Sequence, residues 1–161
     1  MKPIPPIQLR DVEPGDLPTF FEHQRDPDAN RMAAFTSRNP EDRDAFIAHW
    51  QRILADPSIT KKTILFAGVV AGNIVLYDHD GRPEIGYWIG REFWGRGIAT
   101  RAVALFLKLI PTRPIYASAA KDNLGSIRVL EKSGFRQWRT ATGYANSRGQ
   151  VIEEVILIRE E

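Results

Sequence analysis

The sequence contains no cysteine, and this absence excludes several kinds of chemistry. Disulfide bonds, thiolate metal sites and cysteine nucleophiles are ruled out. No apolar run approaches the roughly 20 residues that a helix needs to cross a bilayer, and the stretch from Met1 to Pro6 lacks the apolar core of a signal peptide. His, Asp and Glu show no metal-ligand spacing, so no metal is expected. These observations favour a cytoplasmic protein with no membrane partner.

The sequence also lacks a large excess of charge of either sign. Lys and Arg number 22 against 20 Asp and Glu, which gives a net charge of +2. Proteins that bind nucleic acid typically carry a stronger and more clustered positive charge, so DNA is not an expected partner. The sequence pI of about 9.0 leaves an RNA- or ribosome-associated binding protein as a minor alternative. The length of 161 residues favours one domain over residues 1–161.

The spacing of apolar residues and turn residues predicts a mixed α/β sheet with helices on both faces, in the order β-α-α-β-β-β-α-β-α-β-β. Strands are expected near 7–10, 63–69, 73–77, 85–89, 115–119, 137–144 and 151–159. Helices are expected over 17–24, from 39 or 40 to 55, over 97–110 and over 123–132, with a loop or broken helix at 25–39. Turns are expected at Val70-Ala71-Gly72, at His79-Asp80-Gly81 and at Asn146-Ser147-Arg148-Gly149, and a left-handed helix C-cap at Gly134.

The most informative segment extends from Glu84 to Thr100, where a predicted strand leads into a glycine-containing turn and then into a helix. The first N–H groups of a helix have no partner within the helix, and they attract anions. Gly95 and Gly97 keep side chains out of the turn, so the backbone can approach a phosphate closely. The segment therefore predicts a site for a phosphate-bearing ligand.

Three glycine-rich motifs could explain this segment. The P-loop string Gly-x4-Gly-Lys-Ser/Thr is absent. The dinucleotide fingerprint G-x-G-x-x-G is incomplete, because Thr100 takes the place of its third glycine and the segment follows an antiparallel meander. The third motif fits better. Trp94-Gly95-Arg96-Gly97-Ile98-Ala99 resembles the Gln/Arg-x-x-Gly-x-Gly/Ala signature of the GNAT N-acetyltransferase superfamily, with Trp94 where Gln or Arg is usual.

A second block supports the same resemblance. The segment from Asn123 to Phe135 resembles the Asn-x-x-Ser-x-x-Val-Leu-Glu-Lys-x-Gly-Phe pattern of the branch that contains the ribosomal-protein alanine acetyltransferases. The order of strands and helices also matches the GNAT fold, although the resemblance is weak before about Thr63. The resemblance implies acetyl-CoA as co-substrate and an amine as acetyl acceptor.

The resemblance further implies where acetyl-CoA would bind. In GNAT enzymes the two strands that correspond to 85–89 and 115–119 splay apart, and the pantetheine arm lies between them. The implied contacts are mostly backbone groups, one of which can act as an oxyanion donor. For the side chains of Tyr87 and Ile89 we expect core packing, and Arg96 and Arg101 either add charge near the phosphates or are surface residues. The expected cofactor-binding residues are Tyr87, Trp88, Ile89, Gly95, Arg96, Gly97, Ile98, Ala99, Thr100 and Asn123.

Transfer of an acetyl group to an amine needs two proton transfers. Many GNAT proteins place a Tyr in the last helix to protonate the departing thiolate, but Leu130 stands at that position here. We expect Ser126 to donate a hydrogen bond to the thiolate, unless its hydroxyl only bonds the start of its own helix. Glu84 is the best candidate for the general base, directly or through water, unless it is only a hairpin residue.

The expected function is direct transfer of an acetyl group from acetyl-CoA to a primary amine, either a protein N-terminus or a small molecule. Residues 25–38, Trp88 and the strand pair near Tyr144 are expected to form the acceptor site. The missing tyrosine favours an alternative, a CoA-binding module without catalysis. A homodimer through the last strands is implied by the resemblance alone. The sequence does not identify the acceptor or the preferred acyl chain.

Overall fold

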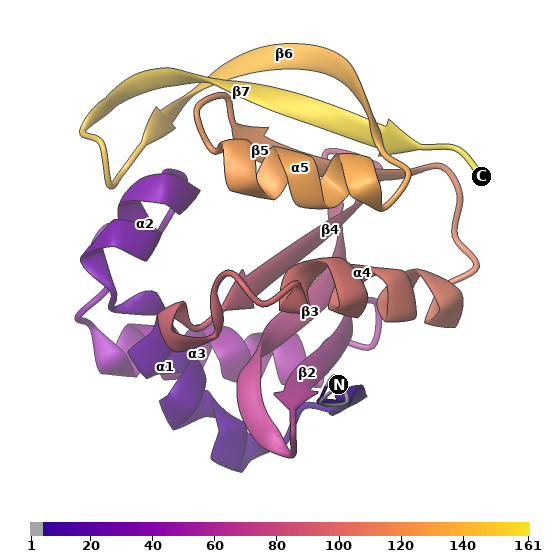
Figure 1. Ribbon diagram of the computed structural model, residues 1–161. Coiled ribbons are helices and arrows are strands. Elements are labelled where there is room, and N and C mark those ends of the chain that lie inside the picture. The colour runs from indigo at the N-terminus through magenta and orange to yellow at the C-terminus, as the bar shows by residue number, and fades with distance from the viewer. Residues whose placement is uncertain (1–4) are drawn as a thin grey trace.

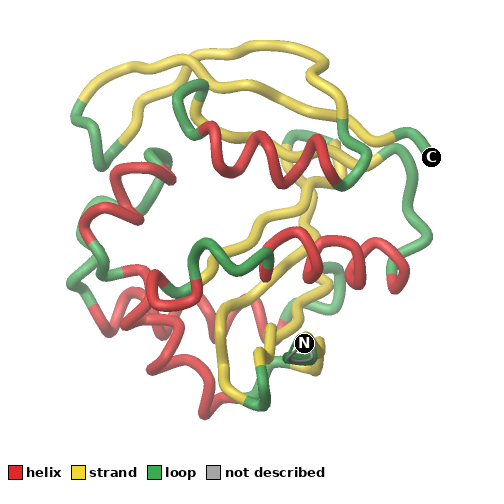
Figure 2. The backbone as a smooth tube through the Cα atoms, viewed as in Figure 1, coloured by secondary structure: helices red, strands yellow, loops and turns green. Residues whose placement is uncertain are grey.

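The computed structural model describes residues 5–161, which form one seven-stranded mixed sheet in the order β1-β2-β3-β4-β5-β7-β6 (Figure 1). In the tube view, β6 and β7 form a long arch at the top of the molecule (Figure 2). The strands are β1 (Ile7–Asp11), β2 (Thr60–Phe66), β3 (Val69–His79), β4 (Arg82–Ile89), β5 (Ile115–Ala120), β6 (Arg136–Ala145) and β7 (Gln150–Arg159). The helices are η1 (Pro14–Asp16), α1 (Leu17–Gln24), α2 (Pro27–Ala33), α3 (Arg43–Ala55), η2 (Arg91–Phe93), α4 (Ile98–Leu109) and α5 (Leu124–Lys132), where η denotes a single 3₁₀ turn.

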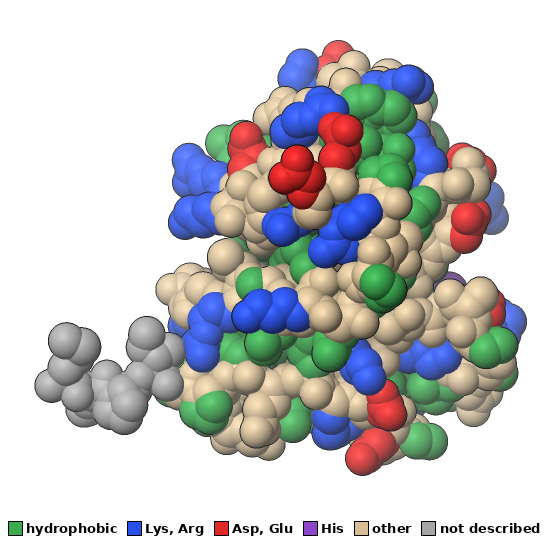
Figure 3. All heavy atoms as spheres, turned by 90° about the vertical axis from the view of Figure 1, so that its right-hand side faces the viewer, with side chains coloured by type: hydrophobic (Ala, Val, Ile, Leu, Met, Phe, Trp, Pro, Cys, Tyr) green, Lys and Arg blue, Asp and Glu red, His purple; other side chains and the backbone are tan. Residues whose placement is uncertain are grey.

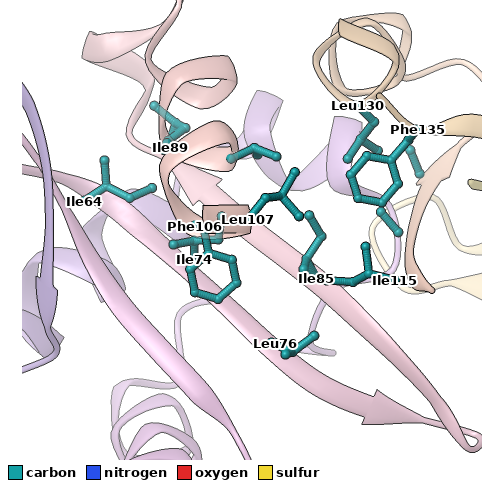
Figure 4. Close-up of a cluster of buried hydrophobic side chains, with 14 of the residues drawn as sticks. Ile64, Ile74, Leu76, Ile85, Ile89, Phe106, Leu107, Ile115, Leu130 and Phe135 are labelled. Atoms are coloured by element: carbon teal, nitrogen blue, oxygen red, sulfur yellow. The ribbon is translucent and has the colours of Figure 1, made fainter. Parts of the chain in front are cut away.

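Side chains alternate between the two faces of the sheet, and this alternation divides the core into two layers. Ile74 and Leu76 of β3 belong to the larger cluster, under α4 and α5, whereas Val75 between them packs with α1 and α3 on the opposite face. Figure 4 shows the larger cluster, in which Phe106 of α4 lies against the sheet. Phe106 is fully buried, and truncating a buried Phe to Ala typically costs about 3–5 kcal/mol. The predicted sheet with helices on both faces is confirmed.

One helix was not predicted. Residues 25–39, expected as a loop or broken helix, contain α2, so residues 5–161 hold one α-helix more than the predicted order. This helix has no long apolar stripe. It begins because the Asp26 carboxylate accepts a hydrogen bond from Ala29 N at 2.9 Å and because Pro27 occupies the first position. It ends at Ala34, whose φ of +65° stops the helical repeat.

The turn between β2 and β3 was predicted in the wrong place. It lies at Ala67-Gly68, whose φ values of +51° and +79° suit a tight two-residue hairpin. Gly72, which we had assigned to the turn, lies within β3 opposite Ile89. A Cβ added there would lie 2.0 Å from the carbonyl oxygen of Trp88. Gly72 therefore permits a close approach of two strands and does not reverse the chain.

Most other predicted elements are confirmed within one to three residues. The hairpin at Asp80-Gly81, the β6–β7 hairpin, and the parallel pairing of β4 with β5 across α4 are all present. Gly134 follows α5 with a φ of +91°, as expected for a left-handed cap. Helix α3 begins at Arg43 and not at 39 or 40, because Asp42 caps it. Among residues 5–161, no helix has the length and apolar character that crossing a bilayer requires.

Candidate functional site: a cavity beside strand β4

Strands β4 and β5 run parallel but are paired at a single position, Glu84 with Tyr116. Each strand is fully paired on its other edge, β4 to β3 and β5 to β7. The two strands therefore separate beyond this point, which confirms the predicted splay. A cavity of about 550 Å³ lies beside the splay. Its lining comes from α2 (Ala29, Met32, Ala33), from β4 (Tyr87, Trp88, Ile89), from the turn and the start of α4 (Phe93, Trp94, Gly95, Gly97, Ile98, Ala99, Thr100), and from α5 and its cap (Asn123, Gly125, Ser126, Arg128, Val129, Lys132).

The start of α4 forms one wall of this cavity. Gly97 occupies the N-cap with a φ of +72°, in the left-handed region that glycine adopts without strain. It provides no side chain to bond the helix start, so the first N–H groups of α4 have no internal partner. A helix of 12 residues that ends in this way attracts negative charge at its N-terminus.

All charged side chains that line the cavity are basic. Arg128 and Lys132 lie one helical turn apart on α5, and no Asp or Glu lines the cavity. Both side chains are exposed, and neither forms an ion pair with any residue in the described part of the chain. No role for either residue was predicted from the sequence. The signal that could have found them is the i, i+4 spacing of two cations on the helix that also carries Ser126.

A hydrogen bond between side chains links β4 to α5 at the cavity. Tyr87 Oη and Ser126 Oγ are 2.8 Å apart. Burial raises the pKa of Tyr87, and the hydrogen bond with Ser126 only partly opposes this effect. The Tyr87 ring packs against the core as expected, but its hydroxyl lies at the cavity, so core packing describes this side chain incompletely. Leu130, at the position where a tyrosine is usual, is buried beside Phe135 (Figure 4).

The hydroxyl of Ser126 does not bond the start of its own helix. Asn123 performs that role, because its side-chain oxygen accepts a hydrogen bond from Ser126 N at 3.3 Å. Asn123 is therefore the N-cap of α5. The Asn123 side-chain amide also donates to the carbonyl of Met32 at 3.3 Å, which connects α5 to α2 across the cavity.

Trp94, which replaces the Gln or Arg usual in the motif, has a structural role that the sequence did not reveal. Its indole Nε1 donates to the carbonyl of Ile89 at 2.9 Å, and this bond fixes the end of β4 to the turn. The Ile89 carbonyl is thereby already occupied. The indole ring is 43% exposed, and the Arg91 guanidinium lies 5.9 Å from its centroid.

Two predicted site residues, Arg96 and Glu84, do not line the cavity. The Arg96 guanidinium lies over the ring of Phe66, 5.7 Å from its centroid, so the structure does not place its charge where we expected it. Arg101 likewise donates to the carbonyl of Pro5 at 2.8 Å. In both cases the long side chain folds back onto nearby groups of the protein and away from the turn.

Glu84 lies on the face of β4 opposite to Tyr87, because their positions differ by three, an odd number, and side chains alternate along a strand. It is only 4% exposed, and its Oε2 has no hydrogen-bond partner within residues 5–161. Burial, with Glu84 and Glu154 nearby, raises the pKa of Tyr77 to about 12. Glu84 therefore lies where the splay begins, on the α1–α3 face of the sheet, with an oxygen free to accept a proton or a hydrogen bond.

Helix α2 places part of the predicted acceptor region against the cavity. Arg91 forms ion pairs with Asp26 at 3.2 Å and with Asp28 at 2.6 Å, which fasten α2 to the turn after β4. Trp88 lines the cavity, as expected of an acceptor-site residue. Tyr144 on β6 does not line it and is 61% exposed. The structure thus brings together α2 and Trp88, and leaves Tyr144 outside.

Comparison with known proteins identifies the class of protein that this fold and cavity define. The sequence profile of the acetyltransferase (GNAT) domain matches residues 7–136, most of the chain. The chain therefore belongs to the GNAT acetyltransferase family.

Individual relatives agree with this assignment. The chain is 32% identical over 112 residues to YdaF of Bacillus subtilis (strain 168), which bears the provisional name ribosomal N-acetyltransferase. That alignment covers 63% of this chain and 61% of YdaF, so the chain spans less than two thirds of this relative's length. A crystal structure named a probable acetyltransferase is 27% identical, with a TM-score of 0.79 over 96% of this chain and 93% of the other. RimL, a ribosomal-protein α-N-acetyltransferase solved with coenzyme A, shares the fold with a TM-score of 0.80 at 16% identity, over 98% of both chains.

Proposed function

We propose that this protein transfers an acetyl group from acetyl-CoA directly to a primary amine. The single observation that supports this most strongly is the cavity at the splay of β4 and β5, in a chain that belongs to the GNAT family. The acceptor is an amine of a protein N-terminus or of a small molecule. The name of YdaF and the activity of RimL favour a protein N-terminus.

The residues present suit acetyl-CoA. The N–H groups of the turn from Gly95 to Thr100 would hold the pyrophosphate, since the N-terminus of α4 is uncapped and no acidic side chain lines the cavity. Arg128 and Lys132 would attract the remaining phosphate. The β4 segment Tyr87–Ile89 would contact the pantetheine arm, apart from the Ile89 carbonyl that Trp94 occupies. When bound, acetyl-CoA supplies the activated acetyl group.

Two side chains would manage the protons of the reaction. A primary amine is protonated at neutral pH and must lose a proton before it attacks. Glu84, with its unpartnered oxygen at the start of the splay, would accept that proton directly or through a water. Ser126, on the other side of β4, would donate a hydrogen bond to the thiolate that departs. No cysteine is available for an acyl-enzyme route, so transfer is direct.

The alternative of a CoA-binding module without catalysis has one specific observation in its favour, the burial of Leu130 where a tyrosine is usual. The hydroxyl pair of Tyr87 and Ser126 argues against the non-catalytic alternative. Tyr87 belongs to β4 and not to α5, and its hydroxyl can serve as a proton donor in place of the missing tyrosine of α5. An RNA-binding role has less support. On the face that Figure 3 shows, Lys and Arg side chains alternate with Asp and Glu and do not form a continuous basic surface.

The test is a thiol-release assay with acetyl-CoA across small amines and peptides with different N-terminal residues, paired with calorimetric measurement of CoA binding. We expect release that depends on the amine, and Glu84→Gln should lower it mainly by raising the pH at which the rate reaches its maximum. CoA binding without turnover of any amine would support the non-catalytic alternative. Absence of both binding and turnover would refute the proposal.

Dimerisation and location are separate proposals. Strand β6 lies at the edge of the sheet and pairs on one side only within residues 5–161, so we propose this edge as the surface of a homodimer. Sedimentation at several protein concentrations tests it. A cytoplasmic location stays a prediction from the sequence, to be checked by cell fractionation.

A further inference from the structure

The two hydroxyls that meet at the cavity carry a proton that no group among residues 5–161 accepts. Tyr87 Oη and Ser126 Oγ each have one hydrogen, and one of these spans the 2.8 Å between the two oxygens. Neither hydroxyl makes another hydrogen bond within residues 5–161. The second hydrogen therefore remains available to a ligand in the cavity, which both residues line.

From this geometry we propose that Tyr87 and Ser126 form a two-hydroxyl proton relay, in which Ser126 contacts the sulfur of the CoA product and Tyr87 supplies its proton through Ser126. The proposal rests on the proposed acetyl transfer. It gives Tyr87 a positioning and proton-supplying role for which the sequence pattern offers no sign, since the residue belongs to the strand and not to the last helix.

The protons and electrons of the step balance as follows. The amine is neutral at this stage, because Glu84 has already taken its first proton and passed it to solvent. Its nitrogen forms a bond to the acetyl carbon, and the carbon–sulfur bond breaks with its electron pair on sulfur. Ser126 gives its proton to sulfur while Tyr87 gives its own to Ser126 Oγ. The phenolate left on Tyr87 regains a proton from solvent, and the amide nitrogen sheds one to Glu84 and then to solvent. The net change is one proton moved from nitrogen to sulfur.

The chemistry of the two hydroxyls explains why the pair suits this task better than Ser126 alone. A serine hydroxyl is a poor acid, whereas a phenol ionises near pH 10, close to the range of thiols. Burial raises the pKa of Tyr87, so this hydroxyl stays protonated at neutral pH and can donate. Both groups are held in place, Tyr87 by core packing and Ser126 by the capped start of α5. A donor fixed before reaction has little reorganisation to undergo.

The first test measures the bound product and does not need turnover. The thiol of CoA is titrated by its thiolate absorbance in complex with the wild type, Tyr87→Phe, Ser126→Ala and the double variant. In the bound product the hydroxyl pair donates a hydrogen bond to the thiolate and stabilises this charged form, so the wild type should give the lowest thiol pKa and the three variants should share a higher one. Tyr116→Phe is the control, since its ring packs on Trp138 with centroids 5.2 Å apart and its residue does not line the cavity. It should match the wild type.

The second test is kinetic. Each single variant should lower kcat about tenfold or more, with KM for acetyl-CoA nearly unchanged, and the double variant should be no slower than either single one. The high-pH limb of the kcat profile, which reports ionisation of Tyr87, should be lost in Tyr87→Phe. Losses that multiply in the double variant, or a thiol pKa that the substitutions leave unchanged, would overturn the relay while leaving acetyl transfer intact. Failure of the wild type to bind CoA would overturn both proposals.

Discussion

Asp16 provides a quantitative test of what stabilises the junction of β1, β2 and the start of α1. Its carboxylate accepts two hydrogen bonds from the Arg10 guanidinium, at 2.7 and 2.8 Å. It also accepts from Glu13 N at 2.9 Å and from the buried Thr63 hydroxyl at 2.7 Å. These bonds connect β1 and β2 to the turn that starts α1. The perturbation is Asp16→Asn, which keeps the shape of the side chain and removes its charge.

The magnitude follows from the pKa. Burial alone would raise the pKa of Asp16, but the bonds from Arg10, Glu13 and Thr63 outweigh it and lower the value from 3.8 to about 2. Because the folded pKa is depressed, this contribution is complete above pH 3.8 and disappears as the pH falls toward 2. A shift of nearly two pKa units corresponds to about 2 kcal/mol of stability at neutral pH. Roughly half of it should remain at pH 3.

The assay is urea unfolding of the wild type and of Asp16→Asn at pH 7 and pH 3, followed by tryptophan fluorescence. The difference in unfolding free energy should be about 2 kcal/mol at pH 7 and about half as large at pH 3. Asp11→Asn is the matched control, because Asp11 also pairs with a cation, Lys62, but its side chain is 87% exposed. Its midpoint should not move measurably. An equal loss at both pH values, or none at pH 7, would refute the reasoning.

Three further predictions concern the site and its surroundings. Gly97→Val should weaken CoA binding by calorimetry, because a φ of +72° costs a residue with a Cβ roughly 1–2 kcal/mol, and the turn would shift to relieve this strain. The double substitution Arg128→Glu with Lys132→Glu should weaken binding of CoA more than of dephospho-CoA, since each lost attraction near water is worth roughly 1 kcal/mol. Burial lowers the pKa of His23, so the folded state resists protonation there. Stability should therefore fall as the pH drops below 6.5, and His23→Phe should remove this part of the pH dependence of Tm.

Each of these predictions has a control or an outcome that would contradict it. Gly149→Val is the control for Gly97→Val, because it introduces a similar strain, with a φ of +64°, at the β6–β7 turn. It should lower Tm without changing the affinity for CoA. An equal loss of CoA affinity in both variants would show that Gly97 has no special role. Lys108→Glu reverses an exposed charge on α4 outside the cavity, and it should not distinguish CoA from dephospho-CoA. If Tm of His23→Phe depends on pH as it does in the wild type, the loss of stability at low pH does not come from the buried imidazole of His23.

The differences between prediction and structure arise where local patterns compete with tertiary contacts. Val70-Ala71-Gly72 has the composition of a turn, but the facing strand requires a residue without Cβ at Gly72, and Ala67-Gly68 reverses the chain. Helix α2 lacks a clear apolar period, so only its Asp26 cap and Pro27 could have indicated it. The hairpins at Asp80-Gly81 and between β6 and β7, and the capped helix α5, were predictable, because their turn residues and cap act within a few positions of the chain.

In the candidate site, the features that could be predicted from the sequence are those formed by the backbone. The glycine turn and the uncapped start of α4 follow from consecutive residues, so the sequence located them correctly. The roles of long side chains did not follow, because their direction is set by distant partners: Arg96 lies over Phe66, and Arg101 bonds Pro5. The positive charge of the cavity comes instead from Arg128 and Lys132.

The sequence by itself determined that the chain carries a glycine-containing turn between a strand and a helix, and a capped helix with a serine in its first turn. These features depend on local backbone conformation and on hydrogen bonds a few residues apart. Only the tertiary structure decided that Tyr87 reaches Ser126 and that Glu84 lies buried on the other face of the same strand. The physical reason is that the splay of β4 from β5 depends on how each strand pairs with its other neighbour, and this pairing joins segments far apart in the chain.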